Sequence, residues 1–332
     1  MATAGVTEHL GFRALLLAPP ARGKVEELSA APTFSVVIPA YQAAETIAAA
    51  LDSALGQTHP AHEVIVVDDG STDHLESVLA PYLDRVTVVR KSNGGAASAR
   101  NRGAEIASGE FMAVLDADDC FHPRRLEALA ELAVARPDLD LITTDTKMVV
   151  DGEVAGTFRE NTPFAVEAQR QAILESCFVG GWAAVRLDRL RAIGGFDESL
   201  PIAHDWDCWV RLMLAGAQAG LVDRPYYEYR LREGSLTSSR VASLRDRVLL
   251  LEKAAKNPAL RPEDRPALAR SYRRHRSRAV LAEIAEILAT GGRERWRLPG
   301  LALSRGVGLR VRALALLAFS APTLAKKRLP PD

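Results

Sequence analysis

Apolar and polar positions alternate along the chain in two periods from about residue 34. Short runs rich in valine and isoleucine have few polar positions, which is typical of strands buried on both faces. Segments with apolar residues three or four positions apart separate these runs and predict helices. The strands are expected at 35–38, 63–67, 86–89, 111–115 and 141–144, and the helices at 47–55, 75–83, 97–107 and 123–136. This alternation predicts a parallel sheet with helices on both faces.

The pattern changes after about residue 146. Asp151-Gly152 stands between apolar residues and predicts a β-hairpin over 149–154. Further elements are expected at 182–185 (strand), 205–214, 243–256 and 265–288 (helices) and 301–327 (a basic amphipathic stretch). We therefore divide the chain into a poorly ordered leader (1–32), an α/β domain (33–240) and a helical, basic C-terminal extension (241–332).

The composition is that of a folded protein without a general affinity for nucleic acid. The 332 residues are 48% hydrophobic and 25% charged, and 42 Lys and Arg balance 42 Asp and Glu. Residues 261–332 hold sixteen of the basic residues and six of the acidic ones, which leaves 26 basic and 36 acidic residues in the first 260. A basic tail on an acidic body suits contact with an anionic surface. Three scattered cysteines indicate a reducing compartment, the cytoplasm.

Polar residues follow three of the expected strands. They are Pro39-Ala40-Tyr41, Asp68-Asp69-Gly70-Ser71 and Asp116-Ala117-Asp118-Asp119. Because ligands bind beyond the carboxyl ends of parallel strands, we expect these segments to form one rim. Three carboxylates in the last segment suit a hard divalent cation such as Mg²⁺ or Mn²⁺. The alternative is a solvated acidic turn that caps the following helix.

Three further segments have both a chemical and a purely structural interpretation. Asp68 can accept a hydrogen bond from a base ring, or it can form an Asx turn. Small residues at 93–99 let the backbone approach a ligand, and Arg100 can reach a phosphate; the alternative is a tight turn. Asp205 and Asp207 open an apolar helix, either as favourable charges in its first turn or as a catalytic carboxylate among aromatic residues.

These segments together resemble a known family. Residues 35–41, 66–73, 93–109, 115–119, 194–198 and 205–212 match, in this order, the motifs of the family 2 inverting glycosyltransferases with the GT-A fold. The resemblance covers about residues 33–235. It implies an α/β, Rossmann-like GT-A catalytic domain over 33–240, with a mostly parallel sheet flanked by helices and followed by the helical extension.

The resemblance also implies roles for individual residues. Pro39, Ala40, Tyr41 and Asp68 hold the nucleotide base, with Asp69 nearby, and Arg100 serves the nucleotide side. Asp116, Ala117 and Asp118 form the DxD segment that holds the ribose, the diphosphate and the divalent metal, with Asp118 as the main metal ligand and Asp116 as the second. Asp205 is the general base.

The implied reaction is a single displacement that inverts the anomeric carbon. A sugar moves from a nucleotide-diphosphate sugar to a hydroxyl acceptor, which is a glycan, a lipid-linked intermediate or a small molecule. Mn²⁺ or Mg²⁺ stabilises the leaving diphosphate. A UDP-sugar is favoured, because uracil, like thymine, offers a ring N–H to Asp68; guanine has such a donor too, so the preference is mild. The less regular region 180–201 and the helical tail are expected to hold the acceptor.

The chain departs from the family pattern at two positions. His204 stands where many members have Glu, which leaves Asp205 as the base candidate and Asp207 as the runner-up. Arg232 stands near a position where many members have His, so we expect it to bind the diphosphate directly and to loosen the dependence on metal. The processive-synthase motif Gln-x-x-Arg-Trp is absent, because position 292 is Gly.

Other functions are weighed on the same residues. A subunit that binds nucleotide sugars without catalysis is the main alternative, followed by a nucleotidyltransferase. An aspartyl-phosphate hydrolase is disfavoured because Cys120 and Phe121 follow the acidic run where that chemistry needs Thr.

No membrane span is predicted. The apolar stretch 314–324 has about eleven residues and contains Pro322, whereas a span needs ~20. The basic stretch 301–327 has two interpretations. It lies as an amphipathic helix on an anionic membrane, at its inner face where lipid-linked acceptors reside, or it packs on the catalytic domain with its arginines in solvent.

Overall fold

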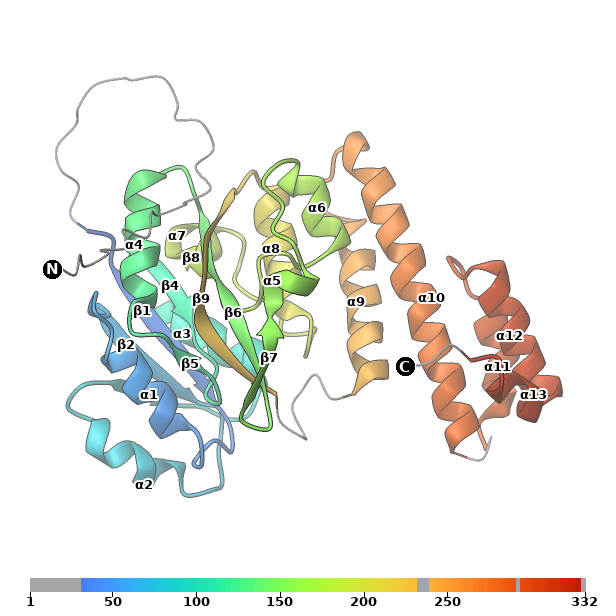
Figure 1. Cartoon of the computed structure of the whole chain (residues 1–332), viewed down its shortest axis with the longest axis horizontal. Helices are drawn as coiled ribbons and strands as arrows, with labels where there is room; N and C mark the ends of the chain where they lie inside the picture. Colours follow the sequence, from blue (N-terminus) through green and yellow to red (C-terminus); the bar gives the residue numbers. More distant parts are fainter. Residues whose placement is uncertain (1–30, 232–238, 291–292, 330–332) are drawn as a thin grey trace, which may run out of the picture.

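The computed structural model describes residues 31–231, 239–290 and 293–329 (Figure 1). Four strands form the parallel half of a nine-stranded sheet, in the order β3 (Thr87–Arg90), β2 (Glu63–Asp68), β1 (Phe34–Ala40) and β4 (Phe111–Val114). All three pairs of neighbours are parallel, as predicted. The predicted leader lies almost entirely outside the described residues.

The second half of the sheet is mixed. Its strands are β5 (Cys120–Phe121), β6 (Leu141–Val150), β7 (Glu153–Thr157), β8 (Ala184–Arg186) and β9 (Ala219–Leu231). β8 runs antiparallel between β4 and β6, whereas β9 runs parallel to β6. The predicted β6–β7 hairpin is present, and Asp151 and Gly152 take positive φ values of 52° and 84° at its turn.

Helices cover both faces of the sheet, as the alternation predicts. One face carries α1 (Ile47–Leu55), α2 (Leu75–Leu79) with a 3-10 turn over Ala80–Tyr82, and α4 (Arg125–Ala135). The other carries α3 (Ala96–Ile106), α6 (Gln169–Glu175), α7 (Leu187–Ala192) and α8 (His204–Leu214). β1 alternates between the two cores: Val36 and Ile38 contribute to the first and Val37 to the second. This explains why its sequence is apolar throughout.

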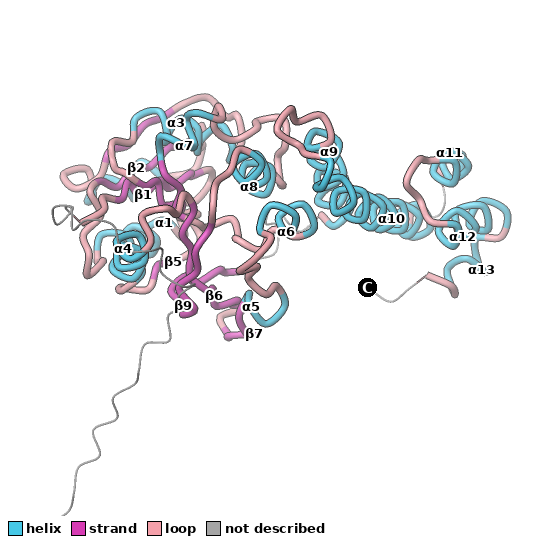
Figure 2. Tube along the Cα trace, turned by 90° about the horizontal axis from the view of Figure 1, so that it is seen from above, coloured by secondary structure: helices cyan, strands magenta, loops and turns pink. Residues whose placement is uncertain are grey.

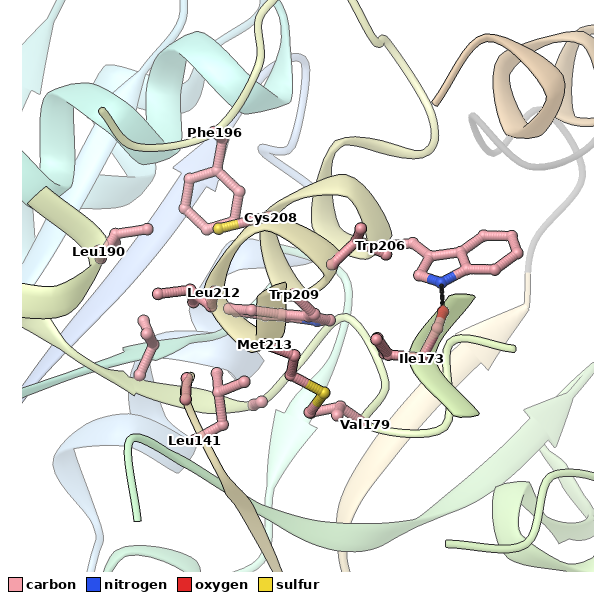
Figure 3. Packing of buried hydrophobic residues seen from close by; sticks show 14 of the residues in the cluster. Leu141, Ile173, Val179, Leu190, Phe196, Trp206, Cys208, Trp209, Leu212 and Met213 are labelled. Atoms are coloured by element: carbon pink, nitrogen blue, oxygen red, sulfur yellow. Dashed lines mark hydrogen bonds between the residues drawn. The ribbon is translucent and has the colours of Figure 1, made fainter. Parts of the chain in front are cut away.

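Helix α8 is anchored on nearly all sides (Figure 3). Trp206 and Trp209 are buried, and the indole Nε1 of Trp206 donates to the carbonyl of Ile173 at 2.6 Å. Trp209 Nε1 donates to the carbonyl of Gly180 at 2.9 Å. These bonds fix both the rotation of α8 and the segment at 173–180, so the residues at the start of α8 are rigidly placed.

The helical extension starts with α9 (Arg240–Ala254) and α10 (Arg265–Ala289), which pack on each other. α9 also contacts α8, and α10 contacts α6 (Figure 2). A short helix, α5 (Phe158–Asn161), and 3-10 turns over Pro262–Asp264 and Arg295–Arg297 complete the connections. Among the described residues, no helix combines the length and the hydrophobicity needed to cross a bilayer.

The basic stretch at 301–327 is three helices and not one. They are α11 (Leu298–Leu303), α12 (Leu309–Ser320) and α13 (Pro322–Lys326). Gly306 takes a φ of 77° between the first two, and Pro322 begins the third. The three helices pack against the C-terminal half of α10, through Val280, Ile284, Ile287 and Leu288, and lie far from the sheet (Figures 1 and 2). The expectation that the stretch packs on the catalytic domain is therefore wrong.

Candidate active site

The segments at the carboxyl ends of β1, β2 and β4 form one rim. Ala40 is paired with Asp68 across β1 and β2. Leu115, at the end of β4, donates from its backbone to Val37 of β1 at 3.1 Å. Because these three strands are parallel neighbours, their carboxyl ends meet at one edge of the sheet. The prediction that the three segments converge is confirmed.

The loop after β1 is clamped to the loop after β2. Gln42, with a φ of 52°, donates from its backbone to Ser71 Oγ at 3.0 Å, and its side-chain Oε1 accepts from the backbone of Thr72 at 2.7 Å. Ala44 donates to Asp73 Oδ2 at 2.9 Å. The clamp leaves the Tyr41 side chain 55% exposed at the rim, where its ring is available to a planar ligand.

The two acids after β2 have different surroundings. Asp68 Oδ1 accepts from the backbone of Ser71 at 2.8 Å, and its Oδ2 lies 3.5 Å from Arg90 Nε. Asp69 is 2% exposed and accepts from Lys91 Nζ at 2.7 Å and from the backbone of the glycine loop, at 3.0 Å from Gly94 and 2.7 Å from Gly95. Asp69 therefore fixes the loop that enters α3.

The DxD segment presents two of its carboxylates and buries the third. The side chain of Asp116 is 36% exposed, Asp118 is half-buried, and Asp119 is 1% exposed. Asp119 accepts from the Tyr227 hydroxyl at 2.7 Å and from the backbone of Arg230 at 2.8 Å. Burial raises the pKa of Asp119 well above its usual value, and the charges of the other two carboxylates raise it further.

Asp119 and Tyr227 therefore tie the acidic loop to β9. Neither was assigned a role from the sequence. The run of three acids in four residues was a sign that one of them serves the structure, since three charges at such spacing repel one another. Behind the loop lies Arg125, which is fully buried and donates to the carbonyl of Trp182 at 2.6 Å. Burial lowers the pKa of Arg125 to about 9.

Arg100 joins the DxD segment to α8. Its Nη2 lies 2.6 Å from Asp116 Oδ1, and its Nη1 lies 2.9 Å from His204 Nε2. Burial lowers the pKa of this guanidinium, but the charges of Asp116 and Asp205 outweigh that effect and leave the pKa raised. Burial and the charge of Arg100 lower the pKa of His204. His204 is therefore neutral, and its Nε2 accepts from Arg100.

Asp205 occupies the first turn of α8, beside this junction. Its Oδ1 accepts from the backbone of Trp206 at 2.7 Å. A Cβ atom on Gly181 would lie 2.5 Å from Asp205 Oδ2. The observed position of this oxygen therefore depends on the absence of a side chain at residue 181. Burial and then the charge of Asp205 raise the pKa of the Cys177 thiol well above its usual value.

Asp207, the second base candidate, lies in different surroundings. It is 3% exposed and pairs with Arg211 at 2.7 Å, and Arg211 in turn donates to the carbonyls of Ile193 and Gly195. Burial raises the pKa of Asp207. Asp207 and Arg211 stand four positions apart on one helix, a spacing from which the ion pair was predictable.

The carboxylate oxygens of the DxD segment are suitable ligands for a hard divalent cation. Among the described residues, no group of three or more His, Cys, Asp and Glu is arranged as a complete metal site. Mg²⁺ and Mn²⁺ commonly take only one or two protein carboxylates and complete their shell with phosphate oxygens and water. Asp116 and Asp118, both accessible from the rim, meet that requirement. Arg232 lies outside the described residues.

The comparisons with known proteins agree with this geometry. The model of glycosyl transferase family 2 matches residues 35–194. The putative teichuronic acid biosynthesis glycosyltransferase TuaG of Bacillus subtilis is 31% identical over 216 residues, which are 63% of this chain and 83% of TuaG. The chain belongs to glycosyl transferase family 2.

Other members of the family show the same likeness. The succinoglycan biosynthesis protein ExoO of Rhizobium meliloti is 33% identical over 244 residues, which are 68% of this chain and 66% of ExoO. An uncharacterized glycosyltransferase of Rickettsia typhi, RT0329, is 30% identical over 187 residues, 55% of this chain. The aligned region spans 59% of that relative, and 58% of its counterpart RP339 in Rickettsia prowazekii.

The solved structures establish the fold of this family 2 chain. S. aureus TarS 1–349 in complex with UDP-GlcNAc has a TM-score of 0.64 at 22% identity, and covers 90% of each chain. The mannosyltransferase PcManGT from Pyrobaculum calidifontis, in complex with GDP-Man and Mn²⁺, has a TM-score of 0.56 at 21% identity and covers 90% of this chain and 89% of that one. The fold is GT-A, as the resemblance implied.

Proposed function

We propose that this chain is an inverting glycosyltransferase that moves a sugar from a nucleotide-diphosphate sugar to a hydroxyl acceptor. The observation that carries the proposal is the Arg100 junction, which links Asp116 of the DxD segment to His204, the neighbour of Asp205. In this proposal an acid that follows β4 and an acid at the start of α8 serve one site, and the charges of both, Asp116 and Asp205, act on Arg100. An enzyme of this kind needs both, one to serve the leaving group and one to activate the acceptor.

The donor lies along the rim in this proposal. Pro39, Ala40, Tyr41 and Asp68 hold the base, and Asp116, Ala117 and Asp118 hold the ribose and the diphosphate. Asp69 and Arg100 act as positioning residues, because their side chains are buried and engaged with the protein. A bound Mn²⁺ or Mg²⁺ supplies positive charge to the diphosphate as it leaves. A UDP-sugar is favoured, since Asp68 can accept from the ring N–H of uracil.

Asp205 is the base. As the acceptor oxygen forms its bond to the anomeric carbon, its proton passes to Asp205 Oδ2, and the bond between that carbon and the diphosphate oxygen breaks with its electron pair. Attack from the face opposite the leaving group inverts the centre, and no enzyme nucleophile is required. General-base help of this kind is worth about 10²–10⁴-fold.

The two parts of the chain have different roles in this proposal. We assign catalysis to residues 33–240 and a supporting role to residues 241–332. The supporting role includes contact with an anionic membrane through α11–α13, where Leu303, Leu309 and Leu316 are exposed beside basic side chains. The relatives TuaG and ExoO, named for teichuronic acid and succinoglycan biosynthesis, favour a place in polysaccharide biosynthesis.

Release of nucleoside diphosphate from a panel of UDP-, GDP- and dTDP-sugars, with Mn²⁺, tests the proposal. We expect slow hydrolysis of one donor without acceptor. Asp118→Asn should reduce it strongly, while Arg102→Gln, which alters an exposed ion pair on α3, should not. Once an acceptor is found, Asp205→Asn should abolish transfer and leave donor binding intact. No turnover of any donor, with one donor still bound, would instead identify the alternative, a binding subunit without catalysis.

A further inference from the structure

A basic pocket lies between α9 and α10, outside the residues assigned to the donor. Its volume is about 370 Å³, and its lining residues are Arg240, Ser243, Leu244, Arg247 and Arg278. Arg247 and Arg278 bring two positive charges to one hollow, and their mutual repulsion favours a bound anion there. Guanidinium groups favour phosphate in particular, because their paired N–H donors match its oxygens.

Arg247 and Arg278 belong to none of the ion pairs that the described residues form with one another. Among the residues that the structure describes, neither has a carboxylate within ion-pair distance. The nearest acid in sequence, Asp246, accepts from the backbone of Ile202 and Ala203, at 2.7 Å each. Glu283 of α10 pairs with Arg245 and Arg297. Asp246 and Glu252 of α9 and Glu283 of α10 are thus engaged with other groups.

The pocket is connected to the proposed base. Asp246, next to Arg247, holds the two residues that precede His204 and Asp205. The charge of Asp205 raises the pKa of the Cys177 thiol, and the charge of Arg247 lowers it. Trp206, which follows Asp205, packs edge-on against His275 of α10 at 5.4 Å between ring centroids. The positive charges of Arg247 and Arg278 both lower the pKa of that histidine. The pocket therefore lies behind the start of α8.

The position excludes the donor diphosphate as the natural occupant. The DxD segment, which serves the donor, follows β4, and the base-binding segments follow β1 and β2. Figures 1 and 2 both place α9 and α10 beyond α8, on the side away from β1 and β2. The pocket therefore lies on the far side of α8 from the segments assigned to the donor. The acceptor of an inverting transferase attacks from the face of the sugar opposite the leaving group, so a subsite on that far side suits the acceptor.

We infer that this pocket binds a phosphate or diphosphate group of the acceptor, so that the acceptor is a phosphorylated molecule. The inference rests on the proposed function, because it takes Asp205 as the base. Two sources share this chemistry: a lipid-linked diphosphate and a soluble or polymeric polyol phosphate. In either case Arg247 and Arg278 hold the phosphate while a hydroxyl of the same molecule reaches Asp205.

Calorimetric titration of the full chain with pyrophosphate, in EDTA and without nucleotide, tests the site. We expect the wild type to bind pyrophosphate, and the double variant Arg247→Gln, Arg278→Gln to bind it at least about tenfold more weakly. The reason is that charge-assisted hydrogen bonds are stronger than neutral ones. Arg273→Gln is the matched control. It removes an exposed arginine of the same helix, about 140° around its axis from Arg278, and should bind as the wild type does.

Two further arms separate the possible explanations. Asp118→Asn, which alters the donor site, should keep pyrophosphate binding; loss of binding in this variant would place the anion at the donor site and overturn the inference. Farnesyl diphosphate that binds more tightly than pyrophosphate would identify a lipid-linked acceptor, and glycerol 3-phosphate that binds at the same arginines would identify a polyol phosphate.

Absence of binding by the wild type, or equal binding by the double variant, would overturn the inference. Melting temperatures check that both variants fold. The titration needs no donor turnover, so a failure of the proposed glycosyl transfer, seen as no release of nucleoside diphosphate from any donor, is distinguishable from a failure of the pocket.

Discussion

Single side chains determine the geometry of the candidate site, and Arg100 has the largest influence on it. It is a cation held between a carboxylate of the DxD segment and a neutral imidazole of α8. An ammonium group on a lysine stem cannot make both contacts with the same planar geometry. The relative placement of the DxD segment and the start of α8 thus depends on one guanidinium.

We expect Arg100→Lys to lower kcat about 100-fold with a smaller change in KM, because a displacement of about 1 Å between catalytic groups costs that much. Steady-state kinetics with the best donor, over a range of donor concentrations, measures the split. Arg102→Gln on the same helix is the control. An unchanged kcat in Arg100→Lys would show that the junction does not position the acids.

Gly181 offers a sharper test at the same scale. An added methyl group would collide with Asp205 Oδ2, at 2.5 Å, so Gly181→Ala should displace this oxygen and reduce transfer at least about tenfold. Gly300→Ala, where a Cβ meets no atom within 4 Å, is the comparison and should leave transfer unchanged. Donor hydrolysis without acceptor should fall less than transfer in Gly181→Ala; equal losses would argue against Asp205 as the base.

At the scale of elements, α8 is the part that the rest of the molecule positions. Asp246 of α9 binds the backbone just before it, Trp206 and Trp209 fix its rotation, and His275 of α10 packs against Trp206. The extension is therefore continuous with the candidate site through α9 and α10, and it supports the helix that carries Asp205, the proposed base.

His275 makes this contact sensitive to pH. Burial, and then the charges of three nearby arginines, lower its pKa to about 4, whereas an unfolded histidine titrates near 6.5. The unfolded chain therefore binds a proton that the folded chain does not, so stability falls as pH decreases from about 6.5 toward 4. We expect the melting temperature of His275→Asn to depend less on pH in that range than the melting temperature of the wild type does. The same slope in both proteins would contradict the assignment.

At the scale of the whole molecule, the chain combines an acidic body with a basic end. α11–α13 lie at the far end of α10, and Leu309 and Leu316, 84% and 52% exposed, stand seven positions apart on one face of α12. Arg310 and Lys326 are exposed nearby. This surface carries the apolar and basic side chains that an anionic bilayer attracts.

Flotation with vesicles tests this surface. We expect the protein to float with anionic vesicles and not with neutral ones, and to be released by high salt, which screens the charges. Leu309→Ser with Leu316→Ser should reduce flotation, while Leu83→Ser, an exposed leucine of the α/β domain, should not. Flotation that is the same for all three proteins would show that α12 does not face the membrane.

The sequence alone determined the alternation of strands and helices over about residues 35–144, the parallel half of the sheet and the segments at its rim. These features follow from local periodicity, since a strand buried on both faces must be apolar throughout and must end in a polar turn. The antiparallel insertion of β8 and the division of 301–327 into three helices were not determined locally, because pairing partners and the surface offered by α10 come from distant parts of the chain.

The tertiary structure alone decided which acids remain available. Asp68 and Asp69 are equivalent in sequence, but the backbone N–H groups of Gly94 and Gly95 engage only the second. Asp119 is engaged by Tyr227, more than a hundred residues later. A carboxylate that is buried among several donors of the protein serves the structure, and the fold alone brings such donors together.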